Sequence, residues 1–209
     1  MDERVITGAA CVAEGAAWLA AQDARLAEAY ALTGPLPLRL KPEGFAELLS
    51  AIVSQQVSVA SANAIWARLQ AAGCEAAAQV AQMSEDELRA LGLSRQKAVY
   101  AKALAVAAID FDALRDVPSA EVIRQLVAVK GIGTWTAEIY AMFSLGRADV
   151  FAHGDLALQE AAKVLYGLDE RPKERAMRQM AQAWAPWRAV AARLLWAYYK
   201  QIKHREGTR

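Results

Sequence analysis

Apolar residues recur at helical spacing along most of the chain. Residues 16–32 predict a first helix, with apolar positions at Trp18, Leu19, Leu26 and Tyr30. Further helices are predicted over residues 45–56, 58–69, 84–91, 95–109, 120–129, 156–166, 174–184 and 189–202. No segment is a convincing strand, and we find no internal repeat and no low-complexity linker. The pattern therefore predicts an all-α protein.

Two of these helices carry polar residues with an expected local role. Ser84 and Glu87 have the spacing of a capping box, in which each side chain bonds the backbone N–H of the other residue. The helix expected from Arg95 to Ile109 is rich in alanine and carries Lys97 and Lys102. We expect these two lysines on its solvated face.

A pair of amides interrupts the apolar pattern between the helices expected at 45–56 and 58–69. Gln55 and Gln56 follow an apolar stretch directly. Core packing explains such a pair poorly, because a buried amide needs hydrogen-bond partners. The sequence therefore marks this junction as a candidate site.

The segment Lys130-Gly131-Ile132-Gly133-Thr134 joins two apolar helical runs. Its glycines permit a tight turn with positive φ and a close approach of the backbone to a partner. Thr134 could cap the following helix, leaving the first amides pointing outward at the positive end of the helix dipole. Such a turn suits an anion, and phosphate is the natural occupant. The alternative is an ordinary turn between helices.

Composition allows one or two small units that share a core, since 56% of the 209 residues are hydrophobic. The net charge of +1 argues against indiscriminate nucleic-acid binding, but the charge is uneven. Residues 171–209 carry ten Lys or Arg against two Glu, or +8, and the first 170 residues carry 14 against 21, or −7. We interpret the part after Ile202 as a solvated, partly frayed tail. Arg188 and Arg193, set among aromatic residues, suit either a phosphate contact or a structural role.

The cysteines and histidines suggest no metal site. Cys11 and Cys74 lie far apart, and neither His153 nor His204 has a neighbour of ligand type, so we expect no zinc site and no disulfide framework. The N-terminus is not followed by a long apolar core, and no apolar run approaches ~18 residues. We therefore expect neither secretion nor membrane insertion, and a reducing cytoplasm as the compartment.

Four stretches carry a further signal: GFAELLSAIVSQQVSVASANAIWARL at 44–69, LVAVKGIGTWTA at 126–137, D-V-F-x-x-x-D at 149–155 and W-x-P-W-R at 184–188. Together they resemble the helix-hairpin-helix DNA glycosylase superfamily, and most of all its 3-methyladenine DNA glycosylase II branch. The resemblance extends over about residues 16–199. It implies a single compact unit of residues 1–209 with helical lobes at approximately 40–120 and 121–209. The helix at 16–32 would pack against the second lobe, with a DNA-binding cleft between the lobes.

The resemblance also assigns DNA-binding residues. In the family the hairpin grips a DNA phosphate, which here implicates Lys130, Gly131, Gly133 and Thr134, with Arg188 as a further candidate. A monovalent cation at the hairpin backbone is also suggested by the family. The residue at the position of Gln56 pushes into the DNA stack and fills the space left by a flipped nucleotide. A polar residue departs from the apolar wedge of some relatives, and a helix-end cap is the alternative role for Gln56.

Asp155 matches the catalytic aspartate that follows the second hairpin helix in the family. Its carboxylate could stabilise an oxocarbenium-like state or activate water, since cleavage of a glycosidic bond needs a negative charge at that place. Asp155 could also cap the helix expected from Leu156, and both roles can coexist.

Two tryptophans match positions that face the base pocket in this branch, Trp135 and Trp196. Their ring faces would hold a positively charged alkylated purine by cation–π attraction, worth about 0.5–2 kcal/mol each. The branch can carry an aromatic residue four positions after Trp135. Here that residue is Ile139, which leaves the substrate range open.

The resemblance implies a monofunctional glycosylase. Lyase members carry a lysine at the position of Trp135, and the four-cysteine iron–sulfur motif of other relatives is absent from this sequence. We therefore predict hydrolytic release of 3-methyladenine, and by extension 7-methylguanine, from double-stranded DNA containing alkylated bases, without a resident metal or cofactor. We expect a cytoplasmic monomer with no membrane association, bound to the nucleoid if the source is bacterial. The alternatives are a glycosylase for mismatched, deaminated or oxidised bases and a non-catalytic module that only docks DNA.

Overall fold

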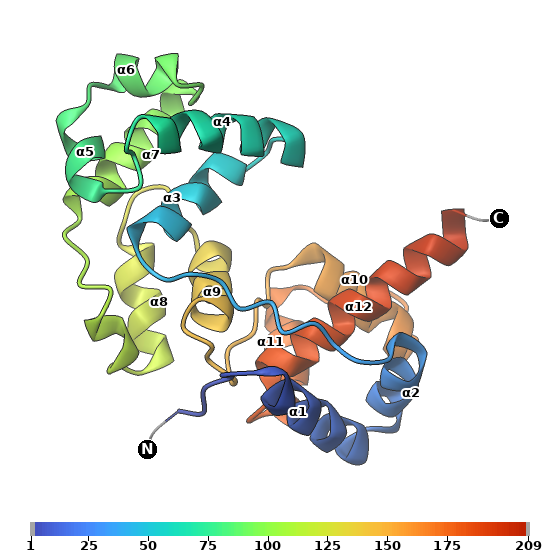
Figure 1. Ribbon diagram of the computed structural model, residues 1–209. Coiled ribbons are helices and arrows are strands. Elements are labelled where there is room, and N and C mark those ends of the chain that lie inside the picture. The colour runs from blue at the N-terminus through green and yellow to red at the C-terminus, as the bar shows by residue number, and fades with distance from the viewer. Residues whose placement is uncertain (1–2, 208–209) are drawn as a thin grey trace. The chain divides into compact units, whose positions relative to one another are not determined.

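The computed structural model describes residues 3–207, which form helices joined by turns (Figure 1). Their order is α1 (Ala9–Gln22), α2 (Ala24–Thr33), α3 (Phe45–Ser54), α4 (Val59–Ala71), α5 (Ala77–Gln82), α6 (Glu85–Ala90), α7 (Arg95–Val106), the 3-10 turn η1 (Ala113–Arg115), α8 (Ser119–Val127), α9 (Thr134–Phe143), α10 (Leu156–Tyr166), α11 (Glu174–Met180), the 3-10 turn η2 (Ala181–Trp184) and α12 (Arg188–Gly207). Among these residues β pairing is limited to an isolated bridge between Val5 and Arg147. The all-α prediction is confirmed.

The chain divides into two compact units, and each is described by itself. The central unit is Lys41–Tyr140, and the terminal unit combines Met1–Leu40 with Ala141–Arg209. The division falls inside α9, whereas the sequence placed a lobe boundary near residue 120. The hairpin stays with the central unit because Gly131 packs on Tyr100 and its carbonyl accepts a hydrogen bond from Gln55. The DNA-binding cleft expected between the lobes stays a prediction.

In the central unit three helices pack on α7. Helices α3, α5 and α6 contact it, and α4 packs against α3. The buried face of α7 contains Ala98 and Ala101, whose small side chains allow close packing. The predicted capping box at the start of α6 is present, with the Ser84 N–H donating to the Glu87 carboxylate at 2.7 Å.

Both lysines of α7 bond the ends of neighbouring helices. The Lys97 ammonium donates to the carbonyls of Val53 and Gln55, at 2.7 and 2.6 Å, at the C-terminal end of α3. Lys102 donates to Ala81 and Met83, at 2.6 Å each, at the end of α5. A cation at a helix C-terminus satisfies carbonyls that lack a partner within the helix and complements the dipole. The prediction of a solvated face for these lysines is therefore wrong, and burial lowers the pKa of Lys97.

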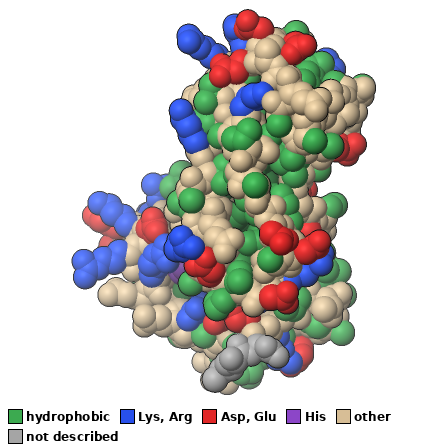
Figure 2. Space-filling model, turned by 90° about the vertical axis from the view of Figure 1, so that its left-hand side faces the viewer, with side chains coloured by type: hydrophobic (Ala, Val, Ile, Leu, Met, Phe, Trp, Pro, Cys, Tyr) green, Lys and Arg blue, Asp and Glu red, His purple; other side chains and the backbone are tan. Residues whose placement is uncertain are grey.

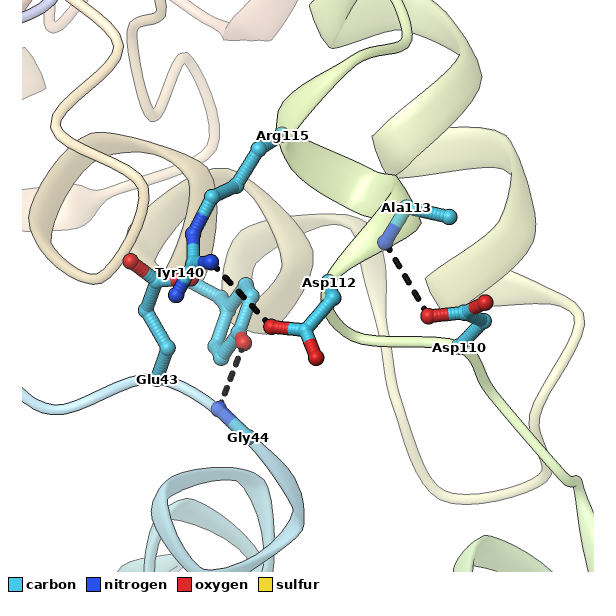
Figure 3. A network of polar contacts seen from close by, with 7 residues as sticks. All are labelled: Glu43, Gly44, Asp110, Asp112, Ala113, Arg115 and Tyr140. Carbon is cyan, nitrogen blue, oxygen red and sulfur yellow. Dashed lines mark hydrogen bonds and ion pairs between the residues drawn. The ribbon is translucent and has the colours of Figure 1, made fainter.

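A polar network joins α9 to the segment before α3 (Figure 3). The Gly44 N–H donates to the Tyr140 hydroxyl at 2.8 Å. Arg115 pairs with Glu43 at 2.9 Å and with Asp112 at 3.1 Å. Burial raises the pKa of Tyr140 to about 12, so the phenol stays neutral. The network fixes the entry of α3 relative to α9 within the central unit.

The terminal unit is built on α12. Helices α1, α2 and α10 pack against it. Gly15 lets α1 approach closely, because a Cβ there would lie 2.7 Å from the Trp187 ring. α12 continues to Gly207, past Ile202, where a frayed tail was expected; residues 208–209 of that tail lie outside the described residues.

The helix predicted over 16–32 is two helices. It starts earlier, at Ala9, and breaks at Asp23, whose carboxylate accepts the N–H groups of Arg25 at 2.8 Å and Leu26 at 3.4 Å. The other Asp23 oxygen accepts the Tyr166 hydroxyl at 2.6 Å. An N-cap that also has a tertiary partner ends one helix and begins the next without any interruption in the apolar pattern.

Other boundaries differ by less. The helix predicted over 174–184 ends at Met180 and continues as the 3-10 turn η2, and α5 is a helix that the apolar pattern does not predict. Basic and acidic side chains are interspersed over the face in Figure 2. Within residues 3–207 no helix combines the length and apolar character that crossing a bilayer requires.

Candidate functional site

The turn between α8 and α9 closes over the side chain of Tyr100. The Ile132 N–H donates to the Val129 carbonyl at 3.1 Å, and Gly131 has a φ of 98°, a conformation that favours glycine. A Cβ on Gly131 would lie 2.6 Å from the Cβ of Tyr100 and closer still to its ring. Glycine is therefore required here both by the backbone conformation and by the approach of α7.

Helix α9 begins with an exposed turn. The Ala137 N–H donates to the Gly133 carbonyl at 3.1 Å, so Gly133 occupies the N-cap position. The prediction that Thr134 caps this helix is wrong, because Thr134 is its first helical residue. Gly133, Thr134 and Trp135 are exposed, as is Lys130, and a Cβ on Gly133 would meet no atom within 4 Å. The start of α9 therefore offers the open surface and the positive dipole end that an anion site needs.

The junction after α3 lies against this hairpin. The Gln55 side-chain amide donates to the Gly131 carbonyl at 3.3 Å. Gln56 has a φ of 55°, and its exposed side chain forms no hydrogen bond within residues 3–207. Since α3 ends at Ser54 with Gln55 as its C-cap residue, Gln56 is not the helix-end cap. The role of Gln56 as the wedge stays a prediction.

Two cavities of the central unit include Gln56 in their walls. The larger, of about 600 Å³, is also lined by Gly131 and Gly133. The smaller, of about 450 Å³, is also lined by Trp135 and Ile139. The structure thus brings together three predicted DNA-binding residues in one cavity, with the predicted base-pocket residue Trp135 on a second cavity that shares Gln56.

The wall of the smaller cavity includes a positively charged side chain that the sequence did not mark as a site residue. Lys41 lines it and forms an ion pair with Glu47 at 2.6 Å. Trp135, on the same cavity, is 46% exposed. Sequence spacing could not have identified Lys41, which stands in a loop before α3 and reaches the cavity only through the fold of the central unit.

In the terminal unit, Asp155 is the N-cap residue of α10. One carboxylate oxygen, Oδ1, accepts the N–H groups of Ala157 at 2.9 Å and Leu158 at 3.0 Å. The predicted capping role is confirmed. Asp155 is partly exposed and stands at the positive end of the α10 dipole. The catalytic role stays a prediction.

Trp196, on α12, contacts this carboxylate. Its indole N–H donates to the same Oδ1 of Asp155 at 3.2 Å. Its ring packs against Phe143, with centroids 5.8 Å apart and planes inclined by 33°. The structure therefore brings together two predicted site residues, Asp155 and Trp196, by a hydrogen bond that the sequence did not indicate. A contact between the Trp196 ring face and a base stays a prediction.

Arg188 has partners inside the terminal unit. Its guanidinium donates to the Ala181 carbonyl at 3.0 Å and forms an ion pair with Asp149 at 3.3 Å. These contacts account for its structural role at the start of α12. The predicted phosphate contact of Arg188 remains untested by them.

Arg193 cannot reach a phosphate, because it is completely buried. Its guanidinium donates to the Leu38 carbonyl at 3.1 and 3.0 Å and to the Ala189 carbonyl at 2.8 Å, and it lies 4.7 Å from the centre of the Phe143 ring. Burial, with a smaller contribution from Arg39, lowers its pKa to about 10. Of the two roles considered for Arg193, the structural one is confirmed.

Within residues 3–207 no three His, Cys, Asp or Glu side chains converge as a metal site would require. At the hairpin the oxygen ligands on offer are neutral backbone carbonyls, two of which, Val129 and Gly131, already accept hydrogen bonds. Neutral carbonyls are compatible with a weakly held monovalent cation, which stays a prediction.

Comparison with known proteins gives consistent results. The family described as HhH-GPD superfamily base excision DNA repair protein matches residues 49–186, about two thirds of the chain. DNA-3-methyladenine glycosylase 1 of Schizosaccharomyces pombe is 30% identical over 178 residues, which are 81% of this chain and 78% of that protein.

Solved structures are similar over nearly the whole chain. The crystal structure of a DNA-3-methyladenine glycosidase from Bacillus halodurans has a TM-score of 0.83 and 34% identity, covering 98% of this chain and 95% of its own. The Schizosaccharomyces pombe 3-methyladenine DNA glycosylase, solved in complex with abasic DNA, has a TM-score of 0.75 and 28% identity, with coverages of 91% and 97%.

Proposed function

Because the chain belongs to the HhH-GPD superfamily of base excision DNA repair proteins, we propose that it is a DNA glycosylase of the 3-methyladenine glycosylase II branch. It would hydrolyse the bond between deoxyribose and an alkylated purine, chiefly 3-methyladenine, in duplex DNA. Relatives with 3-methyladenine glycosylase or glycosidase in their names, matched over most of this chain, support that substrate class.

The observation that carries the proposal is the placement of Asp155. Its carboxylate is held by three donors to one oxygen at the start of α10 and stays partly exposed. A fixed negative charge is what an oxocarbenium-like sugar requires, because the positive charge develops only as the glycosidic bond breaks.

The central unit supplies the features needed to hold DNA. The exposed start of α9 would receive a backbone phosphate, which fixes the position of the duplex without reading its sequence. Gln56, on the wall of the same cavity as Gly131 and Gly133, would fill the gap that a flipped nucleotide leaves. Thr134 and Lys130 flank this contact.

The reaction follows from the charge of the substrate. An alkylated purine that carries a positive charge leaves as a neutral base, taking the electron pair of the C1′–N bond. Water then adds to C1′ and loses its proton, so the product is a free base and an abasic strand. Trp135, exposed on the smaller cavity, would hold the cationic base by cation–π attraction. Ile139 makes that cavity less aromatic than the branch allows.

The test is base release from methylated duplex DNA, with Asp155→Asn as the variant. Wild type should release 3-methyladenine, measured by chromatography, and Asp155→Asn should bind the same DNA while its rate falls roughly 10²-fold or more. Asp169→Asn, a change to an exposed aspartate of the terminal unit, is the matched control and should keep full activity. Full activity of Asp155→Asn would refute the role of the carboxylate.

The same assay separates the alternative functions. Release only from duplexes with mismatched, deaminated or oxidised bases would place the protein in a different glycosylase class. Tight binding of DNA without release of any base would identify a non-catalytic docking module. The proposal includes action as a monomer, which sedimentation on and off DNA would test.

A further inference from the structure

Three donors converge on one oxygen of the Asp155 carboxylate. Two are the backbone N–H groups of Ala157 and Leu158, which belong to α10 itself. They fix the carboxylate relative to its own helix only. The third is the Trp196 indole N–H, at 3.2 Å, which comes from α12. It is therefore the contact among these three that ties the carboxylate to a second helix of the terminal unit.

The Trp196 indole is itself held in orientation. Its ring packs against Phe143 at 5.8 Å, and the Arg193 guanidinium lies 4.7 Å from the centre of the Phe143 ring. Arg193 is completely buried and anchored to the carbonyls of Leu38 and Ala189. A series of contacts thus runs from the buried Arg193 guanidinium through the rings of Phe143 and Trp196 to the Asp155 oxygen.

We infer that Trp196 is a positioning residue, which holds the Asp155 carboxylate through its indole N–H, in addition to any contact of its ring with a base. This inference rests on the proposed function, in which Asp155 faces the reacting sugar. A group that must stand close to C1′ loses effect when it is displaced by about 1 Å. A hydrogen bond to a charged acceptor is also stronger than one between neutral groups.

Substitution of Trp196 separates the N–H from the ring. Trp196→Phe keeps an aromatic face but has no N–H, so kcat should fall about 10- to 100-fold, as expected for the loss of a hydrogen bond to a charged group, while KM is unchanged. Trp196→Leu removes both the N–H and the ring, so its kcat should be at least as low as that of Trp196→Phe. If the ring alone mattered, Trp196→Phe would keep kcat within about twofold of wild type, and the inference would be overturned.

A matched control is the same change at Trp187. This tryptophan is buried in the same unit, beside Gly15 and under the Arg4 guanidinium. Trp187→Phe should lower the melting temperature without lowering kcat. A loss of kcat in Trp187→Phe as large as that in Trp196→Phe would mean that general loosening of the terminal unit causes both, which overturns the inference.

A second control tests whether the effect of Trp196→Phe on kcat depends on the Asp155 carboxylate. The Asp155→Asn variant has no carboxylate charge to position, so adding Trp196→Phe to it should cause no further loss of rate. A further loss as large as that in wild type would show that Trp196 acts independently of Asp155, which overturns the inference. Failure of the proposed function has a different outcome. If wild type releases no base from methylated DNA, the function is wrong and the inference falls with it; if wild type is active and Asp155→Asn is not, the Trp196 variants decide the inference alone.

Discussion

Among single residues, Asp149 shows most directly how burial and charge compete in this chain. One carboxylate oxygen is buried with no hydrogen-bond partner in residues 3–207, and the other pairs with Arg188 at 3.3 Å. Burial raises the pKa of Asp149, although the Arg188 charge opposes the shift. A carboxyl whose pKa is raised by folding binds its proton more tightly in the native state, so the stability that it contributes falls as the pH rises through the window between the two pKa values.

We expect the stability difference between wild type and Asp149→Asn to depend on pH. The free energy of unfolding of wild type, minus that of the variant, should fall as the pH rises from about 4, the ordinary aspartate value, and level off once the carboxyl is ionised in both states. Denaturant unfolding of both proteins across that range measures the difference, in which other titrating groups cancel. A difference that rises with pH would contradict the prediction.

Other residues show why the sequence could not predict every role. Arg193 and Arg188 stand five positions apart among aromatic residues, yet Arg193 is buried completely and Arg188 only in part. In the sequence, Lys97 and Lys102 resemble ordinary solvated lysines of a helix. Their carbonyl partners come within reach only because α3 and α5 pack against α7. Each of these roles depends on which distant carbonyl comes within reach, and that information is tertiary.

At the scale of elements, the start of α9 allows a clean test of the anion site. We expect Gly133→Asp to weaken binding to damaged and undamaged duplexes alike, roughly tenfold or more, because a carboxylate there would repel phosphate. A Cβ at Gly133 meets no atom within 4 Å, and a negative charge at a helix N-terminus is favourable for the fold. Affinity measured over a series of salt concentrations is the readout.

The matched control for that test is Gly133→Asn, which has the same shape without the charge. It should bind DNA more tightly than Gly133→Asp, and both variants should melt close to wild type. Gly131→Ala is unsuitable for the purpose, since its Cβ would meet Tyr100 and destabilise α7. Equal affinity of Gly133→Asp and wild type, with an unchanged salt dependence, would rule out phosphate binding at this turn.

Most helices and turns could be predicted from the sequence, because their signals are local. The turn at Gly131 and the cap at Asp155, for example, depend on backbone conformation and on residues adjacent in the chain. The break at Asp23 was missed because the apolar pattern runs through it, and its second oxygen is used by Tyr166, 143 residues away. The sequence marks Gln55 as an amide that core packing does not explain, but its partner, the Gly131 carbonyl, comes within reach only through the fold.

At the scale of the whole molecule, the family match over residues 49–186 includes both the hairpin of the central unit and Asp155 of the terminal unit. The superfamily resemblance found in the sequence is thereby confirmed. The range of damaged bases does not follow from it, because base choice depends on the few side chains around a pocket. Here Ile139 and the unpredicted Lys41 line the cavity that contains Trp135.

Lys41 bears on the type of reaction, because an amine near the sugar could act as a lyase nucleophile. Its side chain is engaged in an ion pair with Glu47 at 2.6 Å, and the position at which lyase members carry their lysine is Trp135 here. We therefore expect a monofunctional enzyme: borohydride should trap no covalent complex with methylated DNA, and the product strand should remain intact until alkali is added. A trapped adduct would refute this assignment. If the adduct then disappeared in Lys41→Gln but persisted in Lys130→Gln, the nucleophile would be Lys41.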